Sequence, residues 1–194
     1  MKSAGAAKRS TLAILYVETR GFTRMSEILE PQIVFARIAE FFAVVTAAVE
    51  QHEGTVRSML NDTLLATFAG APRAAEAAQE IQRNFSALEE AWQRDYGFRT
   101  AVAMGLHSGD AVIGTLGSPL PEQVLIIGDG VSIAERLLHR ARAGEFVLSK
   151  AIMDELVAAK FTLEADAMPA LALSRRDPIE IFGVKLDMRL DFTD

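Results

Sequence analysis

The first long apolar run in the chain, residues 11–17 (TLAILYV), constrains the fold most strongly. Its side chains are mostly β-branched or large and apolar, without polar alternation, which is typical of a strand buried on both faces of a sheet. Glu18 follows this run directly, and Gly21 marks a turn shortly after it. Because the carboxyl end of a central strand often borders a ligand crevice, Glu18 is a candidate for a metal or phosphate site. The alternative interpretation is a solvated carboxylate at the end of a strand.

Length and composition limit the class of protein. A chain of 194 residues with 50% hydrophobic residues can bury a full core as one domain. The absence of cysteine excludes disulfides, thiolate zinc sites and cysteine nucleophiles. A formal charge of −6 argues against nucleic acid or an anionic membrane as partner. The sequence shows no signal peptide and no uninterrupted apolar run of membrane-spanning length, so we expect a cytoplasmic protein without a membrane span.

Periodicity and turn signals predict a mixture of helices, strands and hairpins. Helices are expected at residues 22–29, with Thr23 as the cap, and at residues 31–54, 72–94 and 128–141. Strands are expected at residues 55–60 and 63–70, in two halves of 98–117 around a turn at Ser108-Gly109, and at 122–128, 145–150, 161–165, 170–174 and 179–186, with a short helix after 150. This order predicts an α+β fold rather than a strictly alternating parallel sheet.

Two carboxylates stand out by their positions. Glu18 ends the first strand, and Asp62 lies in the turn of the predicted hairpin. If those strands are neighbours, the two side chains converge, as in proteins that hold two Mg²⁺ or Mn²⁺ ions against a triphosphate. The alternative for Asp62 is a purely structural role, because aspartate is a common turn former.

Two further groups are candidates to contact a phosphorylated ligand. The segment Arg20-Gly21-Phe22-Thr23 joins Glu18 to the start of a helix, where backbone N–H groups can receive phosphate oxygens. Ser132 and Arg136 lie four residues apart in a predicted helix and therefore share one face. The alternative for Arg136 is an ordinary surface arginine.

Four motifs together resemble the catalytic domain of class III nucleotidyl cyclases. They are VETRGFT, HEGTVRSMLNDTLLATFAGAP, GLHSGDAVIGTLGS and VLIIGDGVSIAERL, and they occur in the order and spacing of that family over residues 11–185. The resemblance implies a ferredoxin-like α+β domain, with a mixed sheet flanked by helices, at residues 11–186 between tails at 1–10 and 187–194. It also implies a head-to-tail dimer with composite sites, in which a ribose 3′-hydroxyl attacks the α-phosphate of a nucleoside triphosphate with the help of Mg²⁺ or Mn²⁺.

The resemblance also assigns roles to single residues. Asp62 matches the second metal-binding aspartate, Arg136 the arginine that stabilises the α-phosphate, and Arg20-Gly21-Phe22-Thr23 the turn that cradles phosphates. The other positions depart from the family: Glu18 replaces the first metal-binding aspartate, Ser58 the base-selecting lysine, Gln123 its partner aspartate and Ser132 the ribose-orienting asparagine.

These departures favour one of two functions. Losing directional contacts to the base leaves adenine and guanine poorly distinguished, and losing one transition-state donor commonly costs about 10²–10³ in rate. The chain is therefore predicted to be a degenerate, dimeric regulatory or nucleotide-binding module. The alternative is an active cyclase with unusual base preference. A homodimer is expected, with a heterodimer as the alternative.

Overall fold

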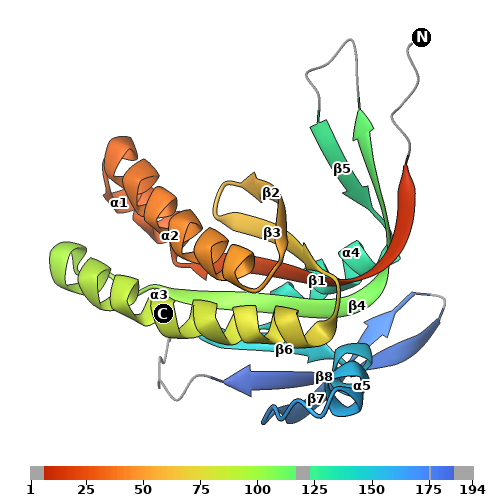
Figure 1. The fold of residues 1–194 in the computed structure, drawn as a ribbon. Coiled ribbons are helices and arrows are strands. Elements are labelled where there is room, and N and C mark those ends of the chain that lie inside the picture. Colours follow the sequence, from red (N-terminus) through yellow and green to blue (C-terminus); the bar gives the residue numbers. More distant parts are fainter. Residues whose placement is uncertain (1–6, 117–122, 175, 186–194) are drawn as a thin grey trace.

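The computed structural model describes residues 7–116, 123–174 and 176–185 (Figure 1). In chain order the elements are β1 (Lys8–Arg20), α1 (Phe22–Ile28), α2 (Pro31–Gln51), β2 (Thr55–Leu60), β3 (Thr63–Phe68), α3 (Ala71–Tyr96), β4 (Ala101–Leu116), β5 (Gln123–Ile127), α4 (Asp129–Arg140), β6 (Glu145–Ser149), α5 (Lys150–Ala158), β7 (Asp166–Leu173) and β8 (Arg176–Lys185).

All of these strands belong to one mixed sheet. Its order is β2-β3-β1-β4-β6-β8-β7, and β5 pairs with the far half of β4. The pairing of β4 with β6 is parallel and the others are antiparallel. The predicted α+β class is confirmed, and so is the central position of the first strand, because β1 pairs with both β3 and β4.

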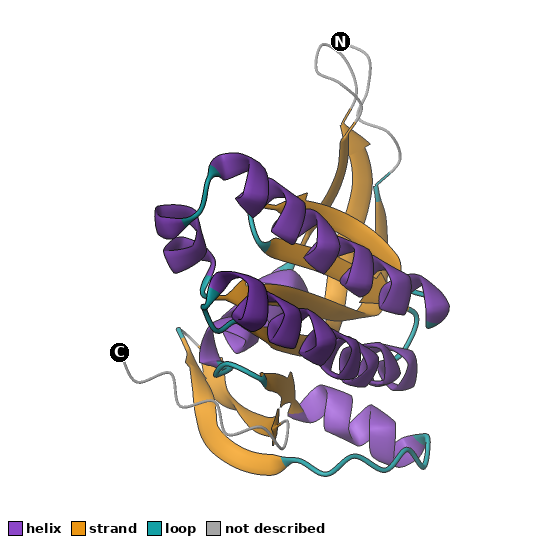
Figure 2. Cartoon of the chain, turned by 90° about the vertical axis from the view of Figure 1, so that its left-hand side faces the viewer, coloured by secondary structure: helices purple, strands orange, loops and turns teal. Residues whose placement is uncertain are grey.

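Alternate residues of β1 face two different helical layers. Leu15 and Val17 are buried in a cluster with α2 and α3, which lie across one face of the sheet (Figure 2). Ile14 and Tyr16 face the other side, where their clusters contain residues of α4. Glu18 and Arg20 continue this second set along the strand, since side chains alternate between faces with a period of two. We call this side of the sheet the α4 face.

Two expected strand boundaries are wrong. Ser108 and Gly109 form no turn; they pair with Ala13 and Leu12 of β1, so β4 continues without a break. A glycine is needed at 109 because a Cβ there would come within 2.8 Å of the His107 ring. Residues 161–165 form no strand either: Phe161 packs against the core and donates its N–H to the carbonyl of Leu156, and β7 begins only at Asp166.

The expected helix cap is also wrong, whereas the hairpin is confirmed. Gly21, with φ 95°, is the N-cap of α1, so Thr23 lies inside the first turn and caps nothing. The left-handed backbone at Gly21 explains why the turn uses glycine. Asn61, with φ 53°, turns the chain between β2 and β3 as its residue type predicts.

Helix α2 qualifies the expectation that the chain has no membrane span. Among the described helices it alone is long and apolar enough to cross a bilayer, by length and composition. In the fold, Phe41, Val45 and Val49 of α2 are buried against the sheet and α3. Core helices meet the same criterion, so we interpret α2 as part of the folded domain.

Candidate functional site

Glu18 and Asp62 lie next to each other at one corner of the sheet. Glu18 pairs across the strands with Thr63, the residue that follows Asp62. The backbone N–H of Thr19 donates to the carbonyl oxygen of Asp62 at 3.3 Å, which ties the hairpin turn to the end of β1. The predicted convergence of the two strand ends is thus present, and both carboxylate side chains are half-buried.

The charge of Glu18 affects the protonation of Asp62. Burial and the neighbouring charge of Glu18 raise the pKa of Asp62 to about 6, although its own backbone hydrogen bond and Arg20 act in the opposite direction. Like charges at short range favour protonation of one partner. A cation at this corner would relieve the repulsion.

The chain supplies such a cation itself. The Arg20 guanidinium forms an ion pair with the Glu18 carboxylate on the same strand. Its Nη2 also donates to the carbonyl oxygens of Leu138 and Ala141, both at 3.0 Å, at the C-terminal end of α4. These carbonyls carry the negative end of the helix dipole, so Arg20 is held from two sides. Its side chain is directed to Glu18 and α4 rather than to the phosphate turn.

A pair of metal ions does not fit these side chains as they stand. Two-ion sites share their carboxylates between ions about 3.5–4 Å apart. Here Arg20 already binds Glu18, and no group of three or more histidines or carboxylates suited to a metal occurs within the described residues. Asp62, the other carboxylate of the pair, has no side-chain hydrogen bond or ion pair with any other of the described residues.

The expected phosphate turn contains a left-handed glycine at the start of a helix. Gly21 adopts a left-handed conformation, and a Cβ at this position would come within 3.1 Å of the Arg99 carbonyl oxygen. Helix α1 begins directly at Phe22, so the N–H groups of Phe22 and Thr23 belong to its first turn. N–H groups at this position have no partner inside the helix.

Ser132 and Arg136 share the exposed outer face of α4, as their spacing predicts. The inner face of the helix, with Ile133, Ala134 and Leu137, packs on the sheet. Arg136 donates through Nη2 to the carbonyl oxygen of Ala172 on β7 at 2.9 Å. The structure therefore does not bring these two residues together with Glu18 and Asp62 inside one chain, because they point away from the sheet.

The remaining expected residues lie on β2 and β5. Ser58 is exposed on β2 opposite Leu65, and its neighbour Arg57 lies at a register shift between Val56 and Ser58. Gln123 pairs by backbone with Leu116, and its side chain lies outside the described part of the structure. Contacts between β2 and β5 bring these two elements close together.

Sequence reasoning missed two residues on the α4 face. Tyr16 is half-buried, and its pKa is raised by burial and by the charge of Glu135. Arg57 is half-buried with its Nε donating to Thr67 Oγ1 at 2.8 Å. Tyr16 belongs to an apolar run that predicts only a buried strand. For Arg57, simple alternation along the strand would place it on the face opposite to Ser58, so the sequence pattern did not indicate either residue.

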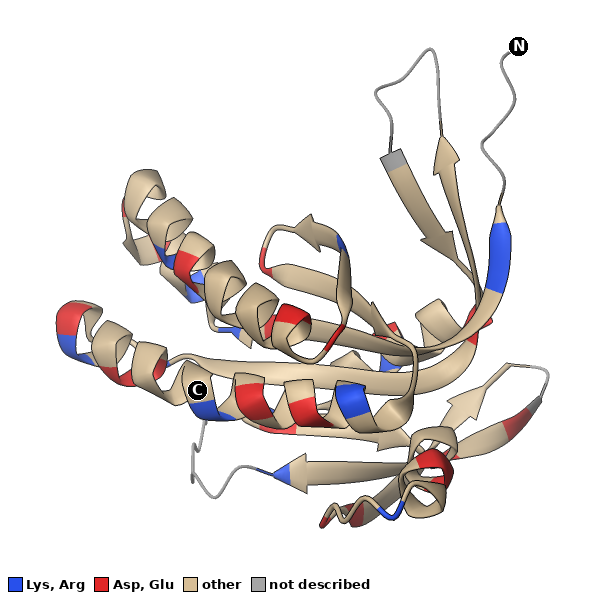
Figure 3. Cartoon of the chain, in the orientation of Figure 1, with Lys and Arg blue, Asp and Glu red and all other residues tan. Residues whose placement is uncertain are grey.

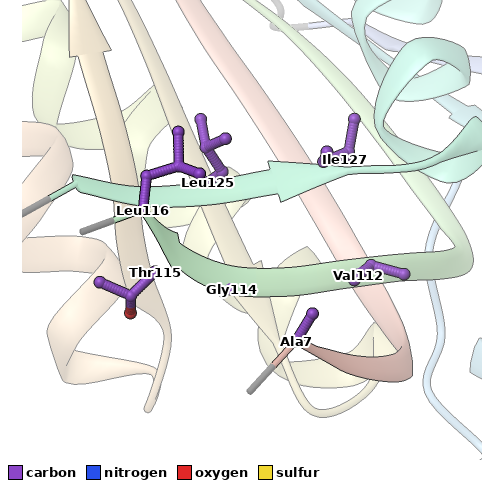
Figure 4. Close-up of a pocket in the computed structure, with 7 residues that line it drawn as sticks. All are labelled: Ala7, Val112, Gly114, Thr115, Leu116, Leu125 and Ile127. Carbon is purple, nitrogen blue, oxygen red and sulfur yellow. The ribbon is translucent and has the colours of Figure 1, made fainter. Parts of the chain in front are cut away.

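Strands β4 and β5 form an apolar arm that rises from the body of the domain (Figure 1). Beside it lies a cavity of about 110 Å³ with almost entirely apolar walls (Figure 4). Its lining consists of Ala7, Val112, Gly114, Thr115, Leu116, Leu125 and Ile127. Strand β5 carries no charged residue, whereas charged residues gather on α3 (Figure 3). The arm thus exposes an apolar surface.

Comparison with known proteins agrees with this arrangement. The family model for the adenylate and guanylate cyclase catalytic domain matches residues 5–186. An adenylate cyclase of Anabaena cylindrica is 29% identical over 139 residues, covering 69% of this chain and 28% of the relative. Adenylate cyclase 1 of Rhizobium meliloti is 30% identical over 142 residues, covering 68% of this chain and 21% of the relative. The chain thus matches about a quarter of the length of these relatives.

Solved structures show the same fold. The adenylyl cyclase CyaB from P. aeruginosa is 21% identical with a TM-score of 0.83, over 97% of this chain and 100% of that one. The guanylate cyclase domain of RhGC from Catenaria anguillulae, solved in complex with GTP, is 18% identical with a TM-score of 0.80, over 92% and 98% of the two chains. Since the family model matches almost the whole chain, this protein belongs to the family of class III adenylate and guanylate cyclase catalytic domains.

Proposed function

We propose that this chain is a regulatory or nucleotide-binding form of the cyclase domain, which acts in intracellular signalling as a dimer with weak or no cyclase activity. One observation carries the proposal: Arg20, itself fixed to α4, binds the Glu18 carboxylate. A metal ion would have to displace a charged partner there. Family members generally depend on divalent metal ions. The ion pair between Glu18 and Arg20 therefore opposes the metal binding on which their reaction depends.

Three further substitutions support low activity. Ser58, Gln123 and Ser132 stand where the resemblance places a base-selecting lysine, its aspartate and a ribose-orienting asparagine. A serine hydroxyl at 132 is shorter than an asparagine amide and offers a single donor. Loss of one transition-state donor commonly costs about 10²–10³ in rate, and residues that act as a unit lose more together than singly.

The dimer is supported by surfaces that one chain leaves open. Ser132 and Arg136 face away from their own sheet, and Val124 and Ile127 on β5 are 51% and 63% exposed. Exposed apolar patches of this kind mark interaction surfaces in many proteins. A second copy would bring the outer face of its α4 to the Glu18 corner of the first. A different cyclase-like chain is the alternative partner.

A product assay tests the proposal. The chain is incubated with each of the four ribonucleoside triphosphates and Mn²⁺, and 3′,5′-cyclic products are separated by chromatography. We expect no product above the level of the Asp62→Ala variant. A cyclic product that disappears in Asp62→Ala would instead establish an enzyme.

An active cyclase with unusual base preference is the second candidate. The retained Asp62 beside Glu18, on a hairpin with the expected backbone, favours it. In that case Mg²⁺ or Mn²⁺ would be held by these two carboxylates, and the pairing of Glu18 with Arg20 would have to open. Product formation in the same assay would select this candidate.

A further inference from the structure

Arg57 on β2 is a half-buried cation without a counter-charge in the described structure. Its Nε donates to Thr67 Oγ1 at 2.8 Å, and none of the described carboxylates lies within ion-pair distance of its guanidinium. Burial alone lowers the pKa of Arg57 from its usual value, with no neighbouring charge acting on it. Its Nη groups are not among the buried nitrogens that lack a partner in the described residues, so they remain accessible to a ligand. A site of this kind is completed when a ligand brings hydrogen-bond acceptors to it.

A β-bulge places this cation on the α4 face. Val56 pairs with Ala66 and Ser58 with Leu65, so Arg57 is an extra residue in β2 with no partner of its own. In such bulges the ordinary alternation of side chains is interrupted. The hydrogen bond from Arg57 goes to Thr67, whose partner on β1 is Ile14, a residue of the α4 face.

Ser58 lies on the same face as Arg57. Ser58 pairs with Leu65 of β3, and Leu65 pairs with Tyr16 of β1. Tyr16 lies two residues before Glu18 on β1, so both side chains are on the same face of the sheet. Arg57 and Ser58 are thus neighbours on the side of the sheet that also carries the carboxylate corner. Where the serine is short, the arginine extends a planar group with several N–H donors.

We propose that Arg57 contacts the base of a bound nucleotide in place of Ser58 and selects guanine. The proposal rests on the nucleotide binding proposed above and adds the substrate class. A guanidinium only donates hydrogen bonds, and guanine presents two neighbouring acceptors, O6 and N7. Adenine presents a donor and an acceptor at the same positions, so it can accept only one of the two bonds. The bulge thereby turns a neighbouring residue into the one that reads the base.

Binding measurements on three proteins test the proposal. Isothermal titration with GTP, ATP and inorganic triphosphate, each with Mg²⁺, is carried out on the wild-type chain, Arg57→Ala and Arg57→Gln. We expect the wild type to bind GTP about tenfold more tightly than ATP. Arg57→Ala should bind the two nucleotides equally. Arg57→Gln should prefer ATP, because a glutamine amide matches the donor and acceptor of adenine.

Arg73→Gln is the matched control. Arg73 is an exposed arginine of α3, paired with Glu53 and Glu76, and the variant should keep the wild-type preference. Arg57→Lys keeps the charge and most of the side chain if Arg57→Ala does not fold. It should retain a reduced preference for GTP, since lysine also contacts the acceptors of guanine.

Three results would overturn the proposal. Equal binding of GTP and ATP by the wild type, unchanged in Arg57→Ala, would exclude a base contact while nucleotide binding itself stands. Equal weakening of GTP, ATP and triphosphate in Arg57→Ala would assign the guanidinium to phosphate. If no nucleotide binds to the wild type, base selection and nucleotide binding both fail, and sedimentation then decides whether the dimeric regulatory role remains.

Discussion

Two regions of the candidate site, the end of β1 and the outer face of α4, differ in how many contacts their side chains make within one chain. At the end of β1, Glu18 is paired with Arg20, and Arg20 is fixed by two carbonyl groups of α4. On the outer face of α4, Ser132 is exposed, and Arg136 has one hydrogen bond to the backbone of β7. The first region is part of the folded domain, whereas the second faces outward.

Compared with the residue roles that the resemblance implies, both regions differ from the family in their side chains. At the carboxylate corner the backbone of the turn and of the hairpin is kept, and the change lies in the longer Glu18 and its internal partner. On α4, the helix and its arginine remain, and the change is the single replacement at Ser132. On this matching, the two regions differ from the family in side-chain chemistry, within a fold that matches a solved cyclase domain. Restoring cyclase activity should therefore require only side-chain substitutions and no change of fold.

Repairing both regions at once should give the largest effect. The variant Glu18→Asp, Ser58→Lys, Gln123→Asp, Ser132→Asn restores the family residues at the metal, base and ribose positions. We expect it to form cyclic AMP from ATP with Mn²⁺ at least about 10²-fold faster than the parent, while each single change does little. Chromatography of the products checks this.

The fourfold variant must first be shown to fold and to bind ATP. If such a variant makes no cyclic AMP, the positions have been matched wrongly or the backbone has moved beyond what side chains can correct.

Replacing one arginine in each region should lower the free energy of unfolding by different amounts. Arg20→Gln breaks an ion pair and two further hydrogen bonds in a half-buried place, so we expect a loss of about 2 kcal/mol in the free energy of unfolding. Arg136→Gln removes one exposed hydrogen bond and should change stability by less than about 0.5 kcal/mol. Urea unfolding measures both values, and equal losses would contradict the difference between the two regions.

Replacing Asp62 should have a smaller, pH-dependent effect. Its folded-state pKa of about 6 lies above the unfolded value, so the folded chain binds more protons between about pH 4 and 6. Ionisation of Asp62 therefore costs stability as the pH rises through this window. We expect Asp62→Asn to gain roughly 1 kcal/mol above pH 6, after allowing for solvent screening, and nothing below about pH 4.

Thermal unfolding across this pH range checks the effect. Asp177→Asn, at an exposed position of β8, is the matched control and should follow the wild type at every pH. A constant gain of Asp62→Asn at all pH values would exclude titration of Asp62 as its cause.

Most of the fold was predictable from the sequence, because apolar runs, glycine turns and proline positions act locally. The sequence predicted the central strand, the Asn61 turn and the start of α2 at Pro31, and the structure confirms them. The break expected at Ser108-Gly109 was wrong, because the partner strand carries the ladder across both residues. Local turn signals do not report such long-range pairing.

The candidate site was less predictable in its side-chain partners. Their positions, at a strand end and in a hairpin turn, predicted that Glu18 and Asp62 would converge if the two strands were neighbours, and the strand pairing confirms that they are. Neither the pairing of Glu18 with Arg20 nor the bulge at Arg57 follows from spacing, because the first depends on carbonyls at the end of α4 and the second on a register shift. The roles assigned to these residues remain predictions.

Förster resonance energy transfer between labels on two copies of the chain tests the central claim. The claim is that the carboxylate corner and the outer face of α4 meet only across a dimer. Because the chain has no cysteine, single labels can be placed without background. Chains labelled with a donor at Leu60→Cys, beside the carboxylate corner, are mixed with chains labelled with an acceptor at Ser132→Cys or, as the control, at Asp95→Cys at the end of α3. We expect stronger transfer to position 132 than to position 95. Absence of transfer at high micromolar concentration, or stronger transfer to position 95, would contradict the claim.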